Sequence, residues 1–252
     1  MNLIGVKALL DKEVRRFLKV PGQTVFSPLI STTLYFLVFG FTLGGAQAQV
    51  DGVPYLVYIV PGLVFLGTAN NAFLNSSSSL FITKIQGTVV DLLVAPLGPA
   101  ELMIGFVTGA MVRGLIVGLS TWAVTLYFTG FHLVHPLESC AFLLLSAYVF
   151  STLGLLAGLW ADKFEHINFF PTFMMLPLTF LGGVFYSVDR LGEPFRTLSL
   201  FNPVVHMLAG LRAGMLGLPL PRATGMTILL VLAVGSSGLA YRLLKSGYKL
   251  KA

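Results

Sequence analysis

Long stretches without a charged side chain are the feature that most restricts the folding of this 252-residue chain. Six of them, one interrupted by Arg113, have about the 20 residues that a helix needs to cross roughly 30 Å of hydrocarbon. They predict an all-α membrane protein with spans near residues 25–44, 55–74, 105–128, 139–160, 167–185 and 224–243. Charged residues make up 10% of the chain, against about 25% in soluble proteins, which excludes an ordinary solvated surface.

The basic residues outside these spans are unevenly divided between the two sides of the membrane. Six spans place both termini on one side, which then holds eleven Lys and Arg against four on the other. Because short cytoplasmic segments carry the excess of Lys and Arg, we expect both termini in the cytoplasm. The net charge of +6 therefore reflects topology, and we expect no nucleic acid partner.

Residues 1–22 are predicted to form an amphipathic helix that lies at the membrane interface. One face is apolar and holds Leu3, Val6, Leu10, Val14 and Phe17. The opposite face is charged and holds Asp11, Lys12, Arg15 and Lys19. Pro21 and Gly22 end this helix before the first span.

The cytoplasmic loop 84–98 contains a short helix by its capping pattern. Thr88 and Asp91 have the spacing of a capping box, and Pro96 stops the helix about two turns later. The apolar residues of this helix are Val89, Leu92 and Leu93. They either pack on the inner membrane surface or meet another protein, and the alternative is a plain re-entry turn.

Residues 189–218 contain two short apolar helices on the outer side. Pro194 can open the first, Asn202 and Pro203 form an N-cap and first helical position, and Gly217 is a helix stop. The second helix is about 21 Å long, too short to span. The segment is either a re-entrant hairpin in the outer leaflet or a helix lying on the surface.

Several chemical activities lack their residues. No G-x-x-x-x-G-K-[ST] string is present, so ATP hydrolysis requires another chain. The four histidines and the single cysteine are dispersed along the sequence, so we predict no metal site and no catalytic residue. The segment 235–238 is similar to a rhomboid protease motif, but no histidine base follows it, so we assign its small residues to helix packing.

Polar residues inside the spans are the remaining candidates. Arg113 either serves a function or extends to the cytoplasmic interface. Asn70, Asn71 and Asn75 on span two need partners on another helix or a wet pathway. Span five carries Pro171 and Pro177, which predict a kink, and ends in two glycines.

Three segments resemble the permease subunit of type-2 ABC exporters. Residues 90–97 resemble that family's coupling helix, 171–187 its fifth helix, and 200–206 the turn of its outer re-entrant hairpin. The resemblance implies a homodimer in a bacterial inner membrane, with two cytosolic ATPase subunits that bind ATP and Mg. It implies that Thr88, Val89, Asp91, Leu92 and Leu93 couple to the ATPase.

The resemblance also places spans two and five at the subunit interface, where Asn70, Asn71, Asn75 and Pro177 would line a transport pathway. We expect ATP-driven export of an amphiphilic or hydrophobic cargo such as a drug, lipid, glycolipid or polysaccharide. The alternative is an ion-coupled secondary transporter, which would need a carboxylate at the midplane. In the sequence every Asp and Glu lies in a loop or at a helix end.

Overall fold

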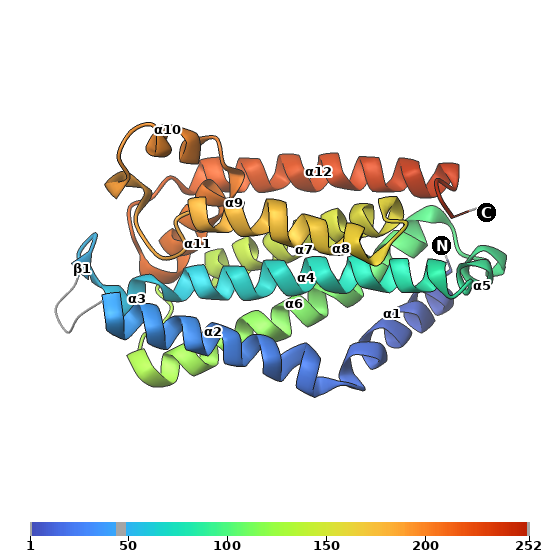
Figure 1. The fold of residues 1–252 in the computed structure, drawn as a ribbon, viewed down its shortest axis with the longest axis horizontal. Helices are drawn as coiled ribbons and strands as arrows, with labels where there is room; N and C mark the ends of the chain where they lie inside the picture. Colours follow the sequence, from blue (N-terminus) through green and yellow to red (C-terminus); the bar gives the residue numbers. More distant parts are fainter. Residues whose placement is uncertain (1, 44–48, 251–252) are drawn as a thin grey trace.

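The computed structural model describes residues 2–43 and 49–250, with side chains at 2–40 and 49–250, and these residues form a bundle of long helices (Figure 1). Both termini and α5 (Val89–Val94) lie at one end of the bundle, here called the terminal end. The β1–β2 hairpin (Gln49–Val50 and Val53–Pro54) and α10 (Phe195–Leu200) lie at the distal end. This single helical body agrees with the all-α prediction.

Five helical segments of the described residues are long and apolar enough to cross a membrane. They are Gly22–Gly40, which includes α2 (Ser27–Leu37); Tyr55–Ile85, which joins α3 (Tyr55–Tyr58) to α4 (Val60–Ile85); α6 (Pro99–Thr129); α7 (Pro136–Trp160); and α12 (Arg222–Ser246). They match five of the six predicted spans, although the predicted end of the first at Gly44 lies outside the described residues.

The fifth predicted span is an interrupted helix. It consists of α8 (Phe164–Phe170), a π-helical turn at Pro171–Met175 and α9 (Leu176–Leu181). Wide turns of this kind occur where the regular hydrogen-bond ladder is broken, and a proline begins this one. At 1.5 Å per residue, the whole element is about 27 Å long. Its role as a sixth span stays a prediction.

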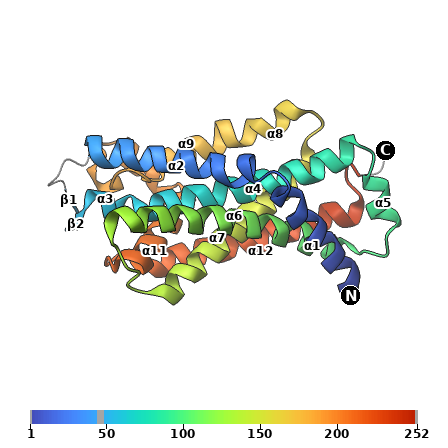
Figure 2. The same ribbon diagram turned by 90° about the horizontal axis from the view of Figure 1, so that it is seen from below.

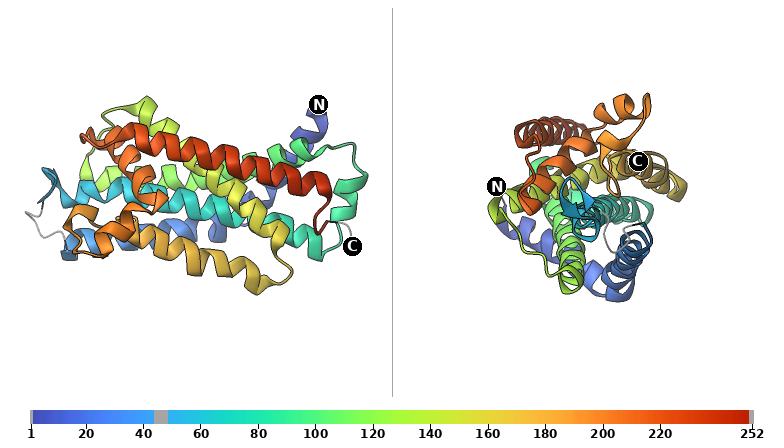
Figure 3. Two further views of the ribbon diagram at one scale, coloured as in Figure 1. Left: turned by 90° about the horizontal axis from the view of Figure 1, so that it is seen from above. Right: turned by 90° about the vertical axis from the view of Figure 1, so that its left-hand side faces the viewer.

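Helix α4 lies at the centre of the bundle and packs against α2, α6, α7 and α11 (Pro203–Leu216), as the two views of Figure 3 illustrate. Small residues permit the close approach: a Cβ added at Gly154 of α7 would lie 2.3 Å from the carbonyl oxygen of Phe73. One added at Gly114 of α6 would lie 2.7 Å from that of Thr68. The predicted glycine packing is therefore confirmed for α6 and α7.

The glycines of α12 behave differently. Outside the backbone of α12 itself and the residues next to each glycine, no described atom lies within 4 Å of a Cβ placed at Gly235 or Gly238. Of the small residues 235–238, the serines rather than the glycines pack within this chain: Ser236 is buried, and the Ser237 hydroxyl forms a hydrogen bond with that of Tyr148 of α7 (2.6 Å).

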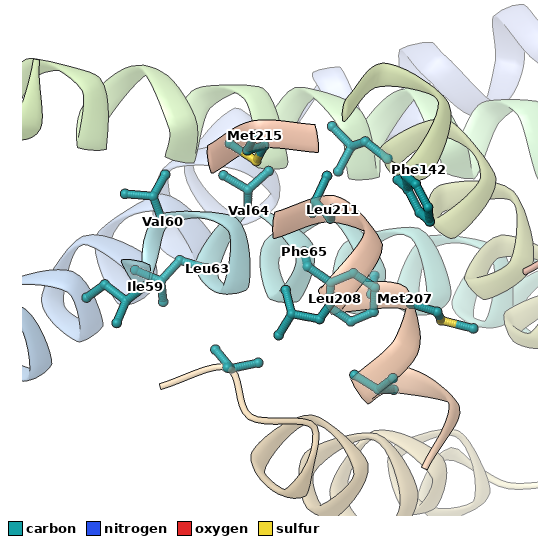
Figure 4. Packing of buried hydrophobic residues seen from close by; sticks show 14 of the residues in the cluster. Ile59, Val60, Leu63, Val64, Phe65, Phe142, Met207, Leu208, Leu211 and Met215 are labelled. Carbon is teal, nitrogen blue, oxygen red and sulfur yellow. The ribbon is translucent and has the colours of Figure 1, made fainter. Parts of the chain in front are cut away.

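The predicted caps of the outer helices are confirmed. Helix α10 follows Pro194, and in α11 the Asn202 side chain accepts a hydrogen bond from the Val204 amide (2.9 Å), while Gly217 adopts a positive φ at the C-cap. Helix α11 is buried among α4, α7 and α12, with Leu208 and Leu211 close to Val64 and Phe65 of α4 (Figure 4). It therefore does not lie exposed on the surface of the bundle.

Helix α1 (Leu3–Leu18) runs at an angle to the bundle and contacts the terminal half of α6 (Figure 2). Its charged residues Asp11, Lys12, Arg15 and Lys19 are exposed, as predicted. The buried stripe is Leu9, Glu13 and Phe17, which is rotated from the predicted apolar face. Gly105 and Gly109 of α6 determine this rotation, because added Cβ atoms would lie 2.4 Å from Leu9 and 2.6 Å from Glu13.

We expect Gly154→Ala to lower the thermal stability of the purified protein in detergent. The added methyl group would overlap the α4 backbone, and such overpacking costs about 1–3 kcal/mol. Gly235→Ala is the matched control, because its methyl group meets open space and alanine is about 0.8–1 kcal/mol better than glycine inside a helix. Tryptophan fluorescence on heating measures both; equal shifts in Tm would contradict the packing of α4 against α7.

Candidate functional site

Two faces of α4 carry different polar residues. Asn70 and Asn71 are consecutive, so their side chains leave the helix about 100° apart. Asn70 is partly exposed, and no hydrogen bond in the described part of the chain uses its amide. Asn71 and Asn75 are buried within the protomer. The three asparagines among the predicted pathway residues therefore occupy two separate sites.

Asn70 lines a cavity of about 200 Å³ between α2, α4 and the interrupted helix α8–α9. Thr172 and Thr179 contribute hydroxyl groups, and Tyr35, Phe180 and Phe185 contribute rings. The side chains that line it in the described structure include none with a charge. The predicted residue Pro177 lies exposed on α9 and is not among them. Such a cavity suits an uncharged chemical group with both apolar and hydrogen-bonding parts.

Arg113 of α6 extends to the buried amides of α4. Its Nη2 donates to Oδ1 of Asn71 (3.3 Å) and its Nη1 to Oδ1 of Asn75 (3.4 Å). Arg16 of α1 donates to the same Asn75 oxygen (2.9 Å). The structure thus favours an internal role for Arg113 over extension to the interface, since a buried guanidinium needs such acceptors.

One carboxylate joins this buried polar cluster. Glu13 is 0% exposed, accepts a hydrogen bond from Ser79 of α4 (2.6 Å), and forms ion pairs with Arg16 (3.3 Å) and Lys12 (3.5 Å). We refer to Glu13, Arg16, Asn71, Asn75, Ser79 and Arg113 as the inner polar cluster. The expectation that every carboxylate lies in a loop or at a helix end is therefore wrong, because Glu13 lies inside α1 and packs inward.

The predicted coupling segment forms α5 at the terminal end. The capping box is wrong: the Thr88 hydroxyl donates to the Thr83 carbonyl (3.3 Å) and caps no amide of α5, while Asp91 is exposed in the first turn. Val89 packs inward and Leu92 faces α1, whereas Leu93 is exposed. The other exposed apolar residues of α5 are Val90 and Val94.

Helix α1 is attached directly to this segment. The Asn2 amide group donates to the Pro96 carbonyl (3.2 Å), and its backbone N–H donates to Glu101 at the start of α6. A Cβ on Gly5 would lie 2.6 Å from Leu97, so the two elements are in close contact. Helix α1 thus contacts both the α5 segment and, through Glu13 and Arg16, the central helix α4.

The C-terminal residues are held at the same end. Lys249 donates to the Trp160 carbonyl (2.9 Å) and to the Asp162 carboxylate. This hydrogen bond holds the pKa of Asp162 below its usual range. The contact links the end of α12 to the loop between α7 and α8.

Comparison with known proteins identifies the family. A model of the ABC-2 type transporter family matches residues 5–216. The chain belongs to that family. It is 37% identical over 250 residues to the inner membrane transport permease YadH of Escherichia coli K12, with 99% of this chain and 98% of the relative covered. It is 23% identical over 204 residues to nodulation protein J of Rhizobium leguminosarum bv. viciae (80% and 78% covered).

Membership of the ABC-2 family confirms the resemblance seen in the sequence. The chain is a membrane subunit of an ABC transporter and, with its several apolar helices, a multi-pass inner membrane permease. Members of such a family work with an ATPase partner, which agrees with the lack of a phosphate-binding loop in the sequence.

Sequence analysis does not identify several residues of these sites, among them Glu13, Arg16 and Ser79 of the inner polar cluster. By their place between the predicted spans, Glu13 falls on the cytoplasmic side and Arg212 on the outer side, yet both side chains are buried in the bundle. Val90 and Val94 were left out of the coupling residues, although they are the most exposed apolar side chains of α5. The signal for Arg212 was present, since it is the single charge inside the apolar helix that ends at Gly217.

We expect Glu13→Ala to destabilise the protein, because it removes the buried carboxylate that pairs with Arg16 and accepts a hydrogen bond from Ser79. The Arg16 side chain is 30% exposed, so the loss should lie below the about 3–5 kcal/mol that is typical of breaking a fully buried ion pair. Asp11→Ala, on the exposed face of the same helix, is the matched control and should leave the Tm within a degree or two. Similar Tm values for the two variants would show that the inner polar cluster contributes little to the fold.

Proposed function

We propose that this chain is the permease subunit of an ATP-driven exporter and that two copies move an amphiphilic or hydrophobic cargo outward between them. The observation that carries the proposal is the uncharged cavity beside Asn70. It opens among helices with exposed apolar side chains, among them Ile30 and Leu34 of α2 and Phe173 of the interrupted helix. Exposed apolar faces of this kind suit contact with lipid or with a second copy.

The cavity lining indicates the class of cargo. Asn70, Thr172 and Thr179 offer a few hydrogen bonds, each worth about 1 kcal/mol, within an otherwise apolar wall. A drug, lipid, glycolipid or polysaccharide part without charge would fit, and it would be held weakly enough to be released. A charged group in the same place would lack an opposite charge.

The ATPase partner is proposed to dock at α5. Val94 is 80% exposed, and Val90 and Leu93 are exposed beside it, which makes an apolar projection at the terminal end. Closure of two cytosolic ATPase subunits, with ATP and Mg bound to them, would move this segment and rock the two permeases. The terminal end is then cytoplasmic, in agreement with the distribution of Lys and Arg.

An ion-coupled secondary transporter is the second candidate, and Glu13 is the observation in its favour. A buried carboxylate could carry a coupled proton. However, Glu13 is ion-paired with Arg16 and lies close to the terminal end, at the level of Ser79, rather than at the midplane. The ABC-2 family match favours the ATP-driven mechanism.

The cargo cavity is tested by Asn70→Trp. The indole ring would fill a large part of the 200 Å³ space, and the Tm should change little because the Asn70 amide bonds to nothing in the described structure. We expect less cargo to co-purify with the permease–ATPase complex from native membranes. The amount, measured by mass spectrometry, should fall at least tenfold if the lost contacts total about 1.4 kcal/mol. Basal ATP hydrolysis should persist.

Val234→Trp is the matched control, since Val234 is exposed on α12 away from the cavity. Asn71→Trp should instead lower the yield of folded protein, because it removes the side-chain oxygen that accepts a hydrogen bond from Arg113. If Asn70→Trp retained the same bound molecules as Val234→Trp, the cavity would not be the cargo site.

The docking surface is tested by Val94→Glu. Burial of a valine side chain contributes about 1.5–3 kcal/mol, so placing a charge there should weaken ATPase binding by tenfold or more. The measurement is the amount of ATPase recovered with tagged permease. Leu137→Glu, equally exposed at the distal end, is the matched control. Loss of the ATPase in the Leu137 variant alone would reverse the proposed orientation.

A further inference from the structure

Arg212 is a buried cation at the distal end of the bundle. It lies on α11, is 5% exposed, and its Nη2 donates to the carbonyl oxygens of Gly183 (2.6 Å) and Val184 (3.1 Å). Its guanidinium lies 4.1 Å from the ring centre of Tyr58. No ion pair of the described residues joins it to a carboxylate. Its charge is therefore balanced by backbone carbonyls and an aromatic ring.

These carbonyls belong to the turn that follows α9, residues 182–185. The last carbonyls of a helix have no partner within the helix and need donors from elsewhere. Besides Arg212, Tyr55 donates through its hydroxyl to the Phe185 carbonyl (2.7 Å), and Asn202 donates to the Leu178 carbonyl (2.5 Å). Side chains from α3 and α11 thus hold the end of α9.

The turn also has little room to move toward α4. Gly183 adopts a φ of +76°, which favours glycine. A Cβ on Gly62 of α4 would lie 2.5 Å from the Val184 oxygen, which also accepts a hydrogen bond from Arg212. The position of the turn is set between Gly62 and Arg212.

Phe185 links this turn to the cavity. Its ring stacks on Phe39 at 4.2 Å and lies 6.0 Å from Tyr35 and 5.7 Å from Phe180. Tyr35, Phe180 and Phe185 also line the cavity beside Asn70. Tyr35 belongs to α2, Phe39 to the π-helical turn that follows it (Val38–Leu43), Phe180 to α9 and Phe185 to the turn after α9. Helix α9 runs toward the distal end, so these rings lie on that side of the cavity.

We propose that Arg212 is a positioning residue that holds Phe185 across the distal end of the cavity and so keeps the outer exit closed at rest. This inference rests on the proposed function, because only in an exporter is the distal opening of the cavity an exit for cargo. The hydrogen bonds of the Arg212 guanidinium fix the backbone of the turn that carries the Phe185 ring. Release of those bonds frees the turn and opens the cavity toward the distal side.

Accessibility of a cysteine in the cavity tests this closure. The reporter is Asn70→Cys in a Cys140→Ser background, since Cys140 is exposed. A membrane-impermeant quaternary ammonium thiosulfonate is added outside spheroplasts, without cargo, and the labelling rate is measured. We expect slow labelling of the reporter, and a rate roughly tenfold higher with Phe185→Ala, as when a state populated at about a tenth becomes the major one.

Arg212→Met should raise the rate by a similar factor. Arg212→Lys should give an intermediate rate, because a lysine keeps the charge but lacks the planar group that stacks on Tyr58. Gly154→Ala, which destabilises the bundle away from the turn, should leave the rate unchanged, and this separates positioning from general loss of stability. A cysteine at Leu191, outside the cavity, should react equally in every background.

An unchanged reporter rate in Arg212→Met would overturn the proposal. If that variant does not fold, Tyr55→Phe removes the hydrogen bond to the Phe185 carbonyl and Gly62→Ala displaces the Val184 oxygen, so both should accelerate labelling. Slow labelling in both of these variants would overturn the proposal equally. The assay needs no ATPase and no cargo, so its failure leaves the Asn70→Trp result, and with it the proposed function, to stand separately.

Discussion

Backbone carbonyls that face hydrocarbon must find their donors inside the protein, and this requirement governs how the helices of this bundle end. Lysine and arginine side chains meet it at two places. Lys84 of α4 donates to the carbonyls of Leu159 and Ala161 at the end of α7 (2.8 Å each), and Arg212 donates to the turn after α9. Both cations lie at helix C-termini, where the helix dipole favours positive charge. The same contacts tie each helix end to a neighbouring helix.

Local features of the chain were predictable from the sequence because they depend on adjacent residues. Asn202, Pro203 and Gly217 specify the start and end of α11 by their own conformational preferences, and the structure has those caps. The charge-free stretches located five spans, since hydrocarbon excludes unpaired charge whatever the tertiary arrangement. The interruption of the fifth predicted span at Pro171 likewise follows from the missing amide of proline.

Contacts between helices were less predictable. Periodicity showed that α1 is amphipathic, but the face that packs depends on Gly105 and Gly109, almost a hundred residues away. For that reason Glu13 was read as a surface charge although it is buried. The polar run on α4 was similarly read as one site, whereas its position relative to Arg113 and the cavity separates Asn71 and Asn75 from Asn70. A single sequence does not contain those relative positions.

This separation on α4 has a mechanical consequence. The inner polar cluster bonds α1 to α4 through Arg16 and Asn75, and α1 in turn contacts the segment that includes α5. Asn70 lies on the same rigid helix but faces the cavity. A displacement of α5 can therefore reach the cavity through α1 and α4 without any bond to Asn70 itself, provided that the inner polar cluster holds. In the proposed mechanism the inner polar cluster would make the two helices move together, while the uncharged face of α4 would stay free for the cargo.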